Sequence, residues 1–115
     1  MFIAAVVVSI VLAAVLVMSA RGKLIRDPQQ LKVMEKIGFP ADKLWLLATA
    51  ELAGAAGLLL GLFWWPLGVA AAIGVMAYFI GAVASHLRKR DWNITPPGVL
   101  LVAGTAALVL RAVTA

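Results

Sequence analysis

Apolar and polar stretches alternate along the chain in a pattern typical of membrane-spanning helices. Four segments, residues 2–20, 44–63, 67–85 and 98–113, are almost entirely apolar. A helix needs about 20 mostly apolar residues to cross a hydrocarbon core of about 30 Å. Backbone polar groups in lipid must be paired within the protein. We therefore predict an all-α fold in which residues 1–115 form one four-helix transmembrane bundle.

The first apolar segment has a competing interpretation as a cleavable signal peptide. Such a peptide needs a basic region before its apolar stretch, yet no Lys or Arg precedes Arg21. Residues 18–20 (MSA) are also a poor match to the small-residue pattern of a cleavage site. We therefore expect this segment to be the first span.

The polar stretch after the first span contains a predicted short helix over residues 28–37. Asp27 is a good N-cap, Pro28 suits the first helical position, and Gly38 is placed to end the helix. Its apolar residues recur at helical spacing, at Leu31, Met34 and Ile37. Because this helix is too short to cross a bilayer, we expect an amphipathic helix on the membrane surface. An ordinary solvated loop helix is the alternative.

Turn and cap signals mark two further boundaries. Trp64, Trp65 and Pro66 predict a tight turn between the second and third spans, at a membrane interface where Trp is favoured. Thr95 is placed to cap the last helix, because two prolines follow it and suit a first helical turn.

The composition supports a membrane protein and excludes several other classes. Hydrophobic residues make up 64% of the chain and charged residues 13%, against about 45–50% and about 25% in soluble domains. A chain of this size cannot bury so much apolar surface in water, which excludes a soluble globular domain, a disordered chain and a nucleic-acid-binding module. The chain has no cysteine, so disulfides, thiolate nucleophiles and Cys-ligated metals are also excluded.

Positive charge is concentrated in two loops on the same side of the predicted bundle. The loop after the first span carries six Lys or Arg residues, and residues 88–90 (RKR) follow the third span. The N-terminal segment and the predicted turn at residues 64–66 carry none. The positive-inside rule therefore predicts a multi-pass protein of the cell (plasma) membrane, with cytoplasmic basic loops and both termini outside.

Glu51 is the most informative polar residue, because it lies within the second predicted span. It is seven residues past Leu44, and so roughly 10 Å along a helix. An ionised carboxylate at the centre of a span costs about 2.5–3.5 kcal/mol on insertion scales, so it faces the bundle interior, pairs or takes a proton. The two interpretations are a ligand-binding or proton-handling role and a buried hydrogen bond that fixes helix register.

Other polar residues are candidates for the same region. Antiparallel threading brings Ser19 and His86, which end the first and third spans, toward Glu51 in the cytoplasmic half of the bundle. Lys23 follows Ser19 by one turn, and Tyr78 lies at mid-membrane depth. Simpler roles compete with ligand binding: an interfacial hydrogen bond for the histidine, and a merely satisfied hydroxyl for the tyrosine.

Two features are expected to be structural. Arg111, near the outer end of the fourth span, is expected to extend to the outer headgroups, with pairing to a bilayer-facing partner or to the chain terminus as the alternative. Small residues should pack the spans against one another, with Ala50, Gly54, Gly57 and Gly61 available on the second span and Gly74, Ala77 and Gly81 on the third. Gly57 and Gly61 form one GxxxG motif, for which packing within the chain is the simpler interpretation and a homo-oligomer interface the alternative.

Several catalytic signatures are missing from the sequence. The single histidine cannot provide bis-His haem ligation within one chain, and there is no HExxH motif, phosphate-binding glycine loop or Ser/His/Asp arrangement. We therefore predict no metal site, and no autonomous hydrolase, kinase or metalloenzyme. A role as the membrane subunit of an oxidoreductase stays open.

The order of short motifs along the chain resembles the DoxX-like family. These motifs are residues 19–24 (SARGKL), 37–40 (IGFP), 51–54 (ELAG), 57–60 (GLLL) and 86–88 (HLR). The resemblance covers nearly the whole chain and implies functional positions at Lys23, Glu51 and His86. The first motif departs slightly, since Ala20 stands where a glycine is common.

The resemblance implies several roles. Some relatives are linked to quinone-coupled sulfur oxidation, some to a superoxide dismutase and a sulfurtransferase, and eukaryotic ones to receptor assembly. We therefore expect a redox- or stress-associated accessory subunit that has a protein partner and binds a quinone or lipid near Glu51 and His86. One alternative is a membrane scaffold or assembly factor without catalysis. Another is a small proton-coupled multidrug transporter, although such transporters carry their glutamate in the first span.

Overall fold

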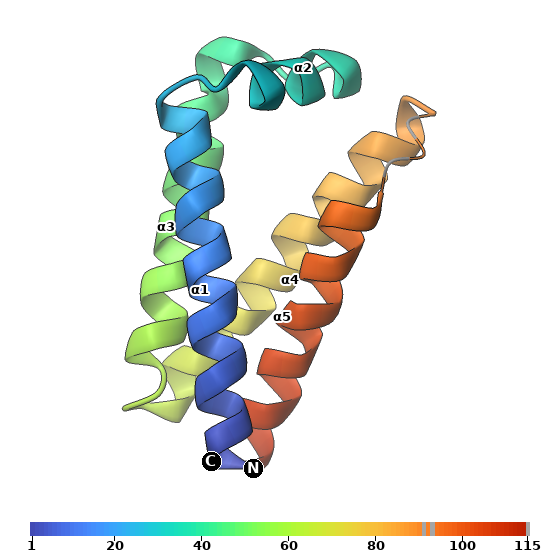
Figure 1. Cartoon of the computed structure of the whole chain (residues 1–115). Helices are drawn as coiled ribbons and strands as arrows, with labels where there is room; N and C mark the ends of the chain where they lie inside the picture. Colours follow the sequence, from blue (N-terminus) through green and yellow to red (C-terminus); the bar gives the residue numbers. More distant parts are fainter. Residues whose placement is uncertain (91, 93, 115) are drawn as a thin grey trace.

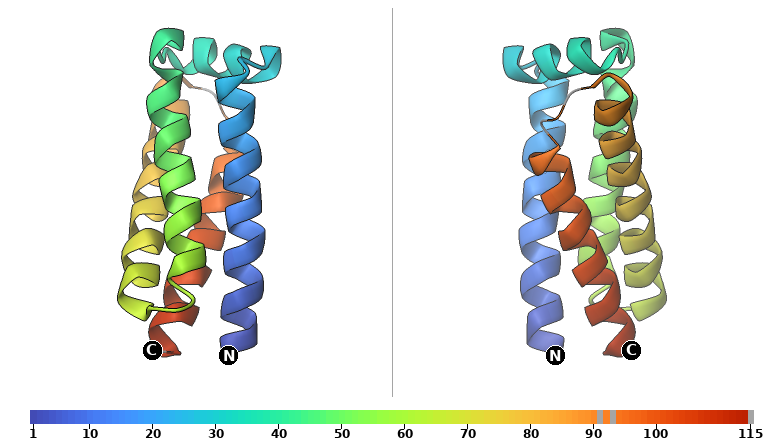
Figure 2. Two further views of the ribbon diagram at one scale, coloured as in Figure 1. Left: turned by 90° about the vertical axis from the view of Figure 1, so that its left-hand side faces the viewer. Right: turned by 90° about the vertical axis from the view of Figure 1, so that its right-hand side faces the viewer.

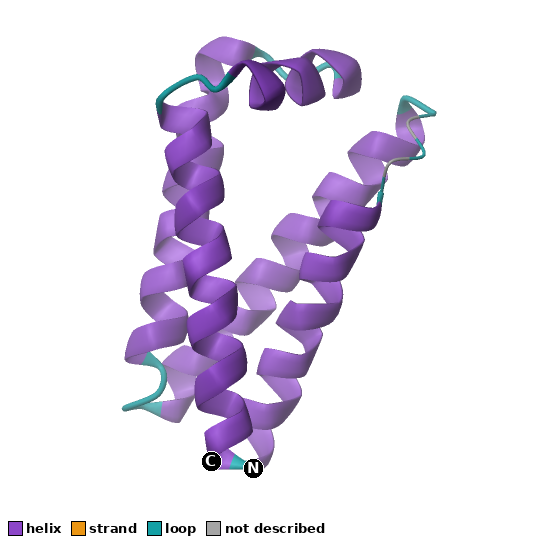
Figure 3. Ribbon diagram, viewed as in Figure 1, coloured by secondary structure: helices purple, strands orange, loops and turns teal. Residues whose placement is uncertain are grey.

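The structure, a computed structural model, describes residues 1–90, 92 and 94–114 and is all-helical over them. Its elements are α1 (Phe2–Leu24), α2 (Pro28–Ile37), the 3-10 helix η1 (Ala41–Lys43), α3 (Leu44–Leu60), α4 (Trp65–Arg88) and α5 (Thr95–Val113). Short loops connect the helices (Figure 3). Three of them, α1, α4 and α5, are long and apolar enough to cross a membrane, and α3 is a shorter apolar helix of 17 residues. The predicted all-α fold is confirmed.

Two boundary predictions are wrong. Trp65 and Pro66 form the start of α4, because Pro fits the first turn of a helix; the turn itself covers residues 61–63. Thr95 is the first helical residue of α5, and the N-cap is Ile94, without a side-chain capping bond. The two prolines that follow Thr95 have no N–H group to satisfy, so the first turn of α5 needs little help from a cap.

Two helix pairs form the body of the molecule. α1 packs along α3 and α4 along α5, while α3 also contacts α4 and α1 contacts α5 (Figure 1). The pairs converge at the end that holds both termini and diverge toward the other end, where α2 lies across them (Figures 1 and 2). The main buried cluster draws on all four apolar helices, through residues such as Leu12, Leu16, Leu58, Val75, Phe79 and Ala107.

The converging end is closed by two glycines and one arginine. A Cβ atom on Gly61 would overlap the backbone of Gly68, so α3 and α4 approach here as closely as glycine permits. Arg111 Nε donates a hydrogen bond to the Gly61 carbonyl at 2.7 Å, and its guanidinium lies 5.6 Å from the centroid of the Phe2 ring. The predicted extension of Arg111 to the headgroups is therefore wrong, because a backbone acceptor within the chain holds the buried side chain.

The predicted small-residue packing holds in only part of the α3–α4 contact. Gly57 faces Ala71 of the same chain, where an added Cβ would lie 2.7 Å from the alanine Cβ. Together with Gly61, this supports packing within the chain as the role of the GxxxG motif. The prediction is wrong for Gly74 and Gly81, whose Cβ positions have no atom of another element within 4 Å.

α2 covers the diverging end of the two pairs. The Asp27 carboxylate accepts a hydrogen bond at 2.9 Å from the backbone N–H two residues later, and Gly38 ends the helix with a φ of 76°. Both cap predictions are confirmed. Met34 and Ile37, on the apolar face of α2, form a buried cluster with Leu44. The sequence predicts that this face lies on the membrane surface, whereas in the structure it packs against the chain itself.

Candidate functional site

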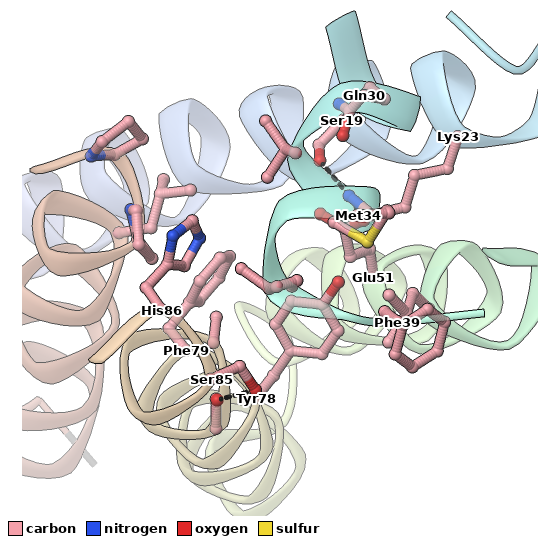
Figure 4. Close-up of a pocket in the computed structure, with 18 of the residues that line it drawn as sticks. Ser19, Lys23, Gln30, Met34, Phe39, Glu51, Tyr78, Phe79, Ser85 and His86 are labelled. Atoms are coloured by element: carbon pink, nitrogen blue, oxygen red, sulfur yellow. Dashed lines mark hydrogen bonds and ion pairs between the residues drawn. The ribbon is translucent and has the colours of Figure 1, made fainter. Parts of the chain in front are cut away.

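A cavity of about 570 Å³ lies beneath α2, between the diverging helix pairs (Figure 4). All five α-helices contribute to its lining, which is mostly apolar. The five polar candidates of the sequence line this one cavity: Ser19, Lys23, Glu51, Tyr78 and His86. Its volume falls within the range of small-molecule sites, about 300–1,000 Å³.

A buried ion pair joins α1 to α3 inside the cavity. Lys23 Nζ lies 2.8 Å from Glu51 Oε1, and the two side chains are only 6% and 1% exposed. Lys23 Nζ also donates a hydrogen bond to Ser19 Oγ at 2.8 Å, one turn earlier on α1. Because α1 continues past the predicted end of the first span to Leu24, Lys23 lies on a helix that packs against α3. Each charge thereby offsets the cost of burying the other.

Tyr78 brings α4 to the same pair of charges. Its side chain interacts with the Glu51 carboxylate, and Figure 4 shows its hydroxyl directed toward that group. Its ring packs edge-on against Phe79, with 4.9 Å between centroids and an interplanar angle of 73°. Glu51 Oε1 is already in contact with the Lys23 ammonium, although no well-aligned hydrogen bond from the described residues reaches it. Because a carboxylate oxygen has two lone pairs, it keeps the capacity to accept a further hydrogen bond from a ligand.

His86 marks the other end of the cavity. It is eight residues beyond Tyr78, which corresponds to about 12 Å along α4. The side chain is buried, and Figure 4 shows it beside Phe79. His86 and Glu51 thus line one cavity from two ends, in the half of the bundle where the antiparallel threading places both residues.

Comparison with protein-family models gives a match over the part of the chain that forms this cavity. The model of the DoxX-like family matches residues 7–110. The chain belongs to the DoxX-like family. No curated protein and no solved structure matches it. The matched region of this DoxX-like protein includes the cavity and all five polar residues that line it.

Residues of α2, the loop after it and α5 complete the cavity of the DoxX-like protein, and the sequence did not predict them. These residues include Gln30, Met34, Phe39 and Pro97. Met34 has a signal in the sequence, since it lies on the apolar face of α2. Gln30 and Pro97 have none, because only the fold shows that α2 and the start of α5 reach the same space.

The charges of the cavity determine which ligands the DoxX-like protein can accept. Lys23 and Glu51 neutralise each other, so this pair offers no net charge to an ion. The ammonium of Lys23 and the imidazole of His86 supply hydrogen-bond donors, and Glu51 supplies an acceptor. Such a set, between apolar and aromatic walls, suits an uncharged ring with polar substituents.

Proposed function

We propose that this DoxX-like protein is an accessory membrane subunit that binds the ring of a quinone in the cavity beneath α2. The observation that carries the proposal is the buried Lys23–Glu51 pair, which lies beside Tyr78 in a cavity with mostly apolar walls. Buried polar groups of this kind are costly in a membrane, so they mark functional sites.

The proposed setting is a four-helix transmembrane bundle in the plasma membrane. α1, α4 and α5 are long enough to span, and α3, with 17 residues, lies at the short end of the spanning range of about 17–25. Large apolar side chains are exposed on all four helices, among them Ile10, Leu52, Ile80 and Val102. In the proposed orientation α2 faces the cytoplasm and both termini face outward, as the positive-inside rule requires.

A quinone fits the chemistry of the cavity better than a phospholipid headgroup. The carbonyl oxygens of a quinone accept hydrogen bonds, which His86 and the one N–H of Lys23 beyond its contacts with Ser19 and Glu51 are able to donate. A reduced quinol hydroxyl is able to donate to Glu51. The ring itself would pack on Phe79. A phosphate would need a cation of its own, but the ammonium of Lys23 is already paired.

The proposed role leaves electron supply to a protein partner. The partner would dock at the cytoplasmic end, where α2 and the basic residues of the two loops lie. This arrangement makes the protein the quinone-binding part of a redox- or stress-associated complex, rather than an enzyme in its own right.

The experiment is purification in a mild detergent, followed by lipid extraction and mass spectrometry for quinones. We expect copurified quinone, and stabilisation by added decylubiquinone of about 2.7 kcal/mol at a hundredfold excess over its Kd. Glu51→Gln and His86→Ala should weaken that stabilisation. Glu35→Gln, on the exposed side of α2, is the matched control.

Three outcomes would overturn the proposal in different ways. Absence of both copurified quinone and quinone-dependent stabilisation would refute quinone binding. If Glu51→Gln and His86→Ala altered only the recovery of copurifying proteins, the scaffold interpretation would replace it. If Glu51→Gln abolished proton-driven uptake of a lipophilic cation into vesicles, the transporter interpretation would replace the proposal.

A further inference from the structure

A second cavity, of about 300 Å³, lies between α3 and α4. Its walls are mostly small or short side chains, Ala50, Ala53 and Gly54 on α3 and Ala71, Gly74 and Val75 on α4, and Leu16 of α1 also lines it. We call this cavity the α3–α4 groove. Ala50, Ala53 and Gly74 are exposed, so the groove opens on the outer surface of the helices, where the proposed bilayer lies.

The α3–α4 groove and the larger cavity are neighbours. Glu51, Tyr78 and Phe79 line both cavities and lie between them. A ligand ring beside Tyr78 would therefore lie next to the groove, with the side chains of these residues at the junction. Among the residues that the structure describes, Glu51 and Tyr78 are the only ionisable side chains that line the groove, so it suits hydrocarbon over the rest of its length.

The two ends of the α3–α4 groove differ in how closely the helices approach. Beyond it, Gly57 contacts Ala71 so closely that an added Cβ would lie 2.7 Å from the alanine Cβ, and Gly61 touches Gly68. In the groove itself the spacing is uneven: an added Cβ on Gly54 would lie 3.0 Å from Val75 Cγ2, whereas one on Gly74 would have no neighbour within 4 Å. The absence of a side chain at Gly74 thus leaves open space that helix packing does not use.

We infer that the α3–α4 groove holds the hydrocarbon chain of a quinone whose ring occupies the cavity beneath α2, and that this ligand enters sideways from the bilayer between α3 and α4. The inference rests on the proposed function and deepens it, because it identifies the ligand as a quinone with an alkyl or prenyl tail. The groove explains how a ring at Glu51 remains attached to a chain that lies in lipid.

The tail contributes mainly by shape. A hydrocarbon chain that moves from lipid into the groove passes from one apolar medium to another, so the hydrophobic effect adds little to its binding free energy. The fit of the chain against the groove walls therefore determines how strongly the tail contributes to binding. Filling the groove with a larger side chain should therefore obstruct the tail sterically while it leaves the ring site unchanged. This separation between tail and ring makes the inference testable.

The experiment compares two quinones on the full-length protein in a mild detergent. Decylubiquinone carries a tail, and a dimethoxy-methyl-benzoquinone with the same ring carries none. Ala50→Leu and Gly74→Leu fill the groove from its two walls. Gly98→Leu on α5 is the matched control, because its Cβ also has open space and it lines neither cavity. Binding is measured by native mass spectrometry and by thermal shift.

We expect both groove variants to weaken decylubiquinone binding by about tenfold or more, equal to about 1.4 kcal/mol, and to leave tailless binding within twofold. Gly98→Leu should change neither. If the groove variants left both ligands unchanged, or weakened both equally, the inference would be wrong while quinone binding stood. If the wild-type protein bound neither quinone, the proposed function itself would fail. Displacement of decylubiquinone by phosphatidylglycerol, with the tailless quinone retained, would assign the groove to a phospholipid chain and overturn the inference.

Discussion

Replacement of Lys23 by Met should destabilise the protein strongly, because it leaves the Glu51 carboxylate buried without its cation. The Nζ and Oε1 atoms are 2.8 Å apart, and at an effective dielectric constant of about 20 their attraction amounts to about 6 kcal/mol. Most of this attraction offsets the cost of removing two charges from water. Loss of one partner leaves that cost uncompensated, and we expect the free energy of unfolding to fall by about 3–5 kcal/mol.

A double-mutant cycle isolates this coupling from other effects of the substitutions. Lys23→Met and Glu51→Leu are each expected to destabilise, whereas the double variant replaces the pair with apolar groups and should lie within about 1 kcal/mol of wild type. Unfolding is followed by circular dichroism as SDS is added to protein in a mild detergent. Lys32→Met, on the exposed side of α2, should stay within about 0.5 kcal/mol of wild type.

The reasoning would be refuted if the double variant were as unstable as the sum of the two single variants. That result would show that Lys23 and Glu51 contribute independently, and that the destabilisation comes from lost packing. Ionic strength provides a second check, because a buried pair is screened far less than a surface pair. We expect the coupling energy to be nearly the same at low and high salt.

Other predictions concern the converging end and the orientation in the membrane. Arg111→Met should lower the free energy of unfolding by about 1–3 kcal/mol, since the Gly61 carbonyl loses its charged donor; an unchanged SDS midpoint would contradict this. Gly61→Ala should lower the free energy of unfolding by about 1–3 kcal/mol or more, because the added Cβ overlaps the backbone of Gly68 and overpacking has a cost of that size. Wild-type stability of this variant would show that α3 and α4 separate here at no cost. The chain has no cysteine, so single cysteines at Lys32 and Phe63 report sidedness without background. A membrane-impermeant maleimide should label position 63 in intact cells and position 32 only after lysis; the reverse pattern would invert the proposed topology.

The helices themselves follow from features of the sequence that act locally. Uncharged apolar runs predict the apolar helices, and Asp27 and Gly38 predict both ends of α2 because caps depend on a few neighbouring residues. Errors in the predicted helix boundaries arise where the same residue is favourable in two local structures. Pro66, for example, suits a turn and the first turn of a helix equally, and the structure contains the second.

The polar residues of the candidate site were predictable from the sequence, whereas the contacts between them and the residues that α2 and α5 add were not. Polar side chains within apolar segments stand out in any sequence, which is why Glu51 and Tyr78 were candidates. The pairing of Glu51 with Lys23 depends on the rotation of α3 against α1 and on an extra turn of α1, and neither follows from spacing alone. Arg111 shows the same limit, because its acceptor is a carbonyl fifty residues away in the chain.

α4 is held close to α3 near its start, where Gly68 touches Gly61, so the helix can be compared to a lever with this contact as its fulcrum. His86 lies 18 residues farther along this helix (86 minus 68), so the lever arm is roughly 27 Å long. With the close glycine contact as the fulcrum, a tilt of about 4° would displace His86 by about 2 Å across such an arm. A small change in the angle of α4 would therefore widen or narrow the cavity beneath α2 while the contact between Gly61 and Gly68 hardly moves.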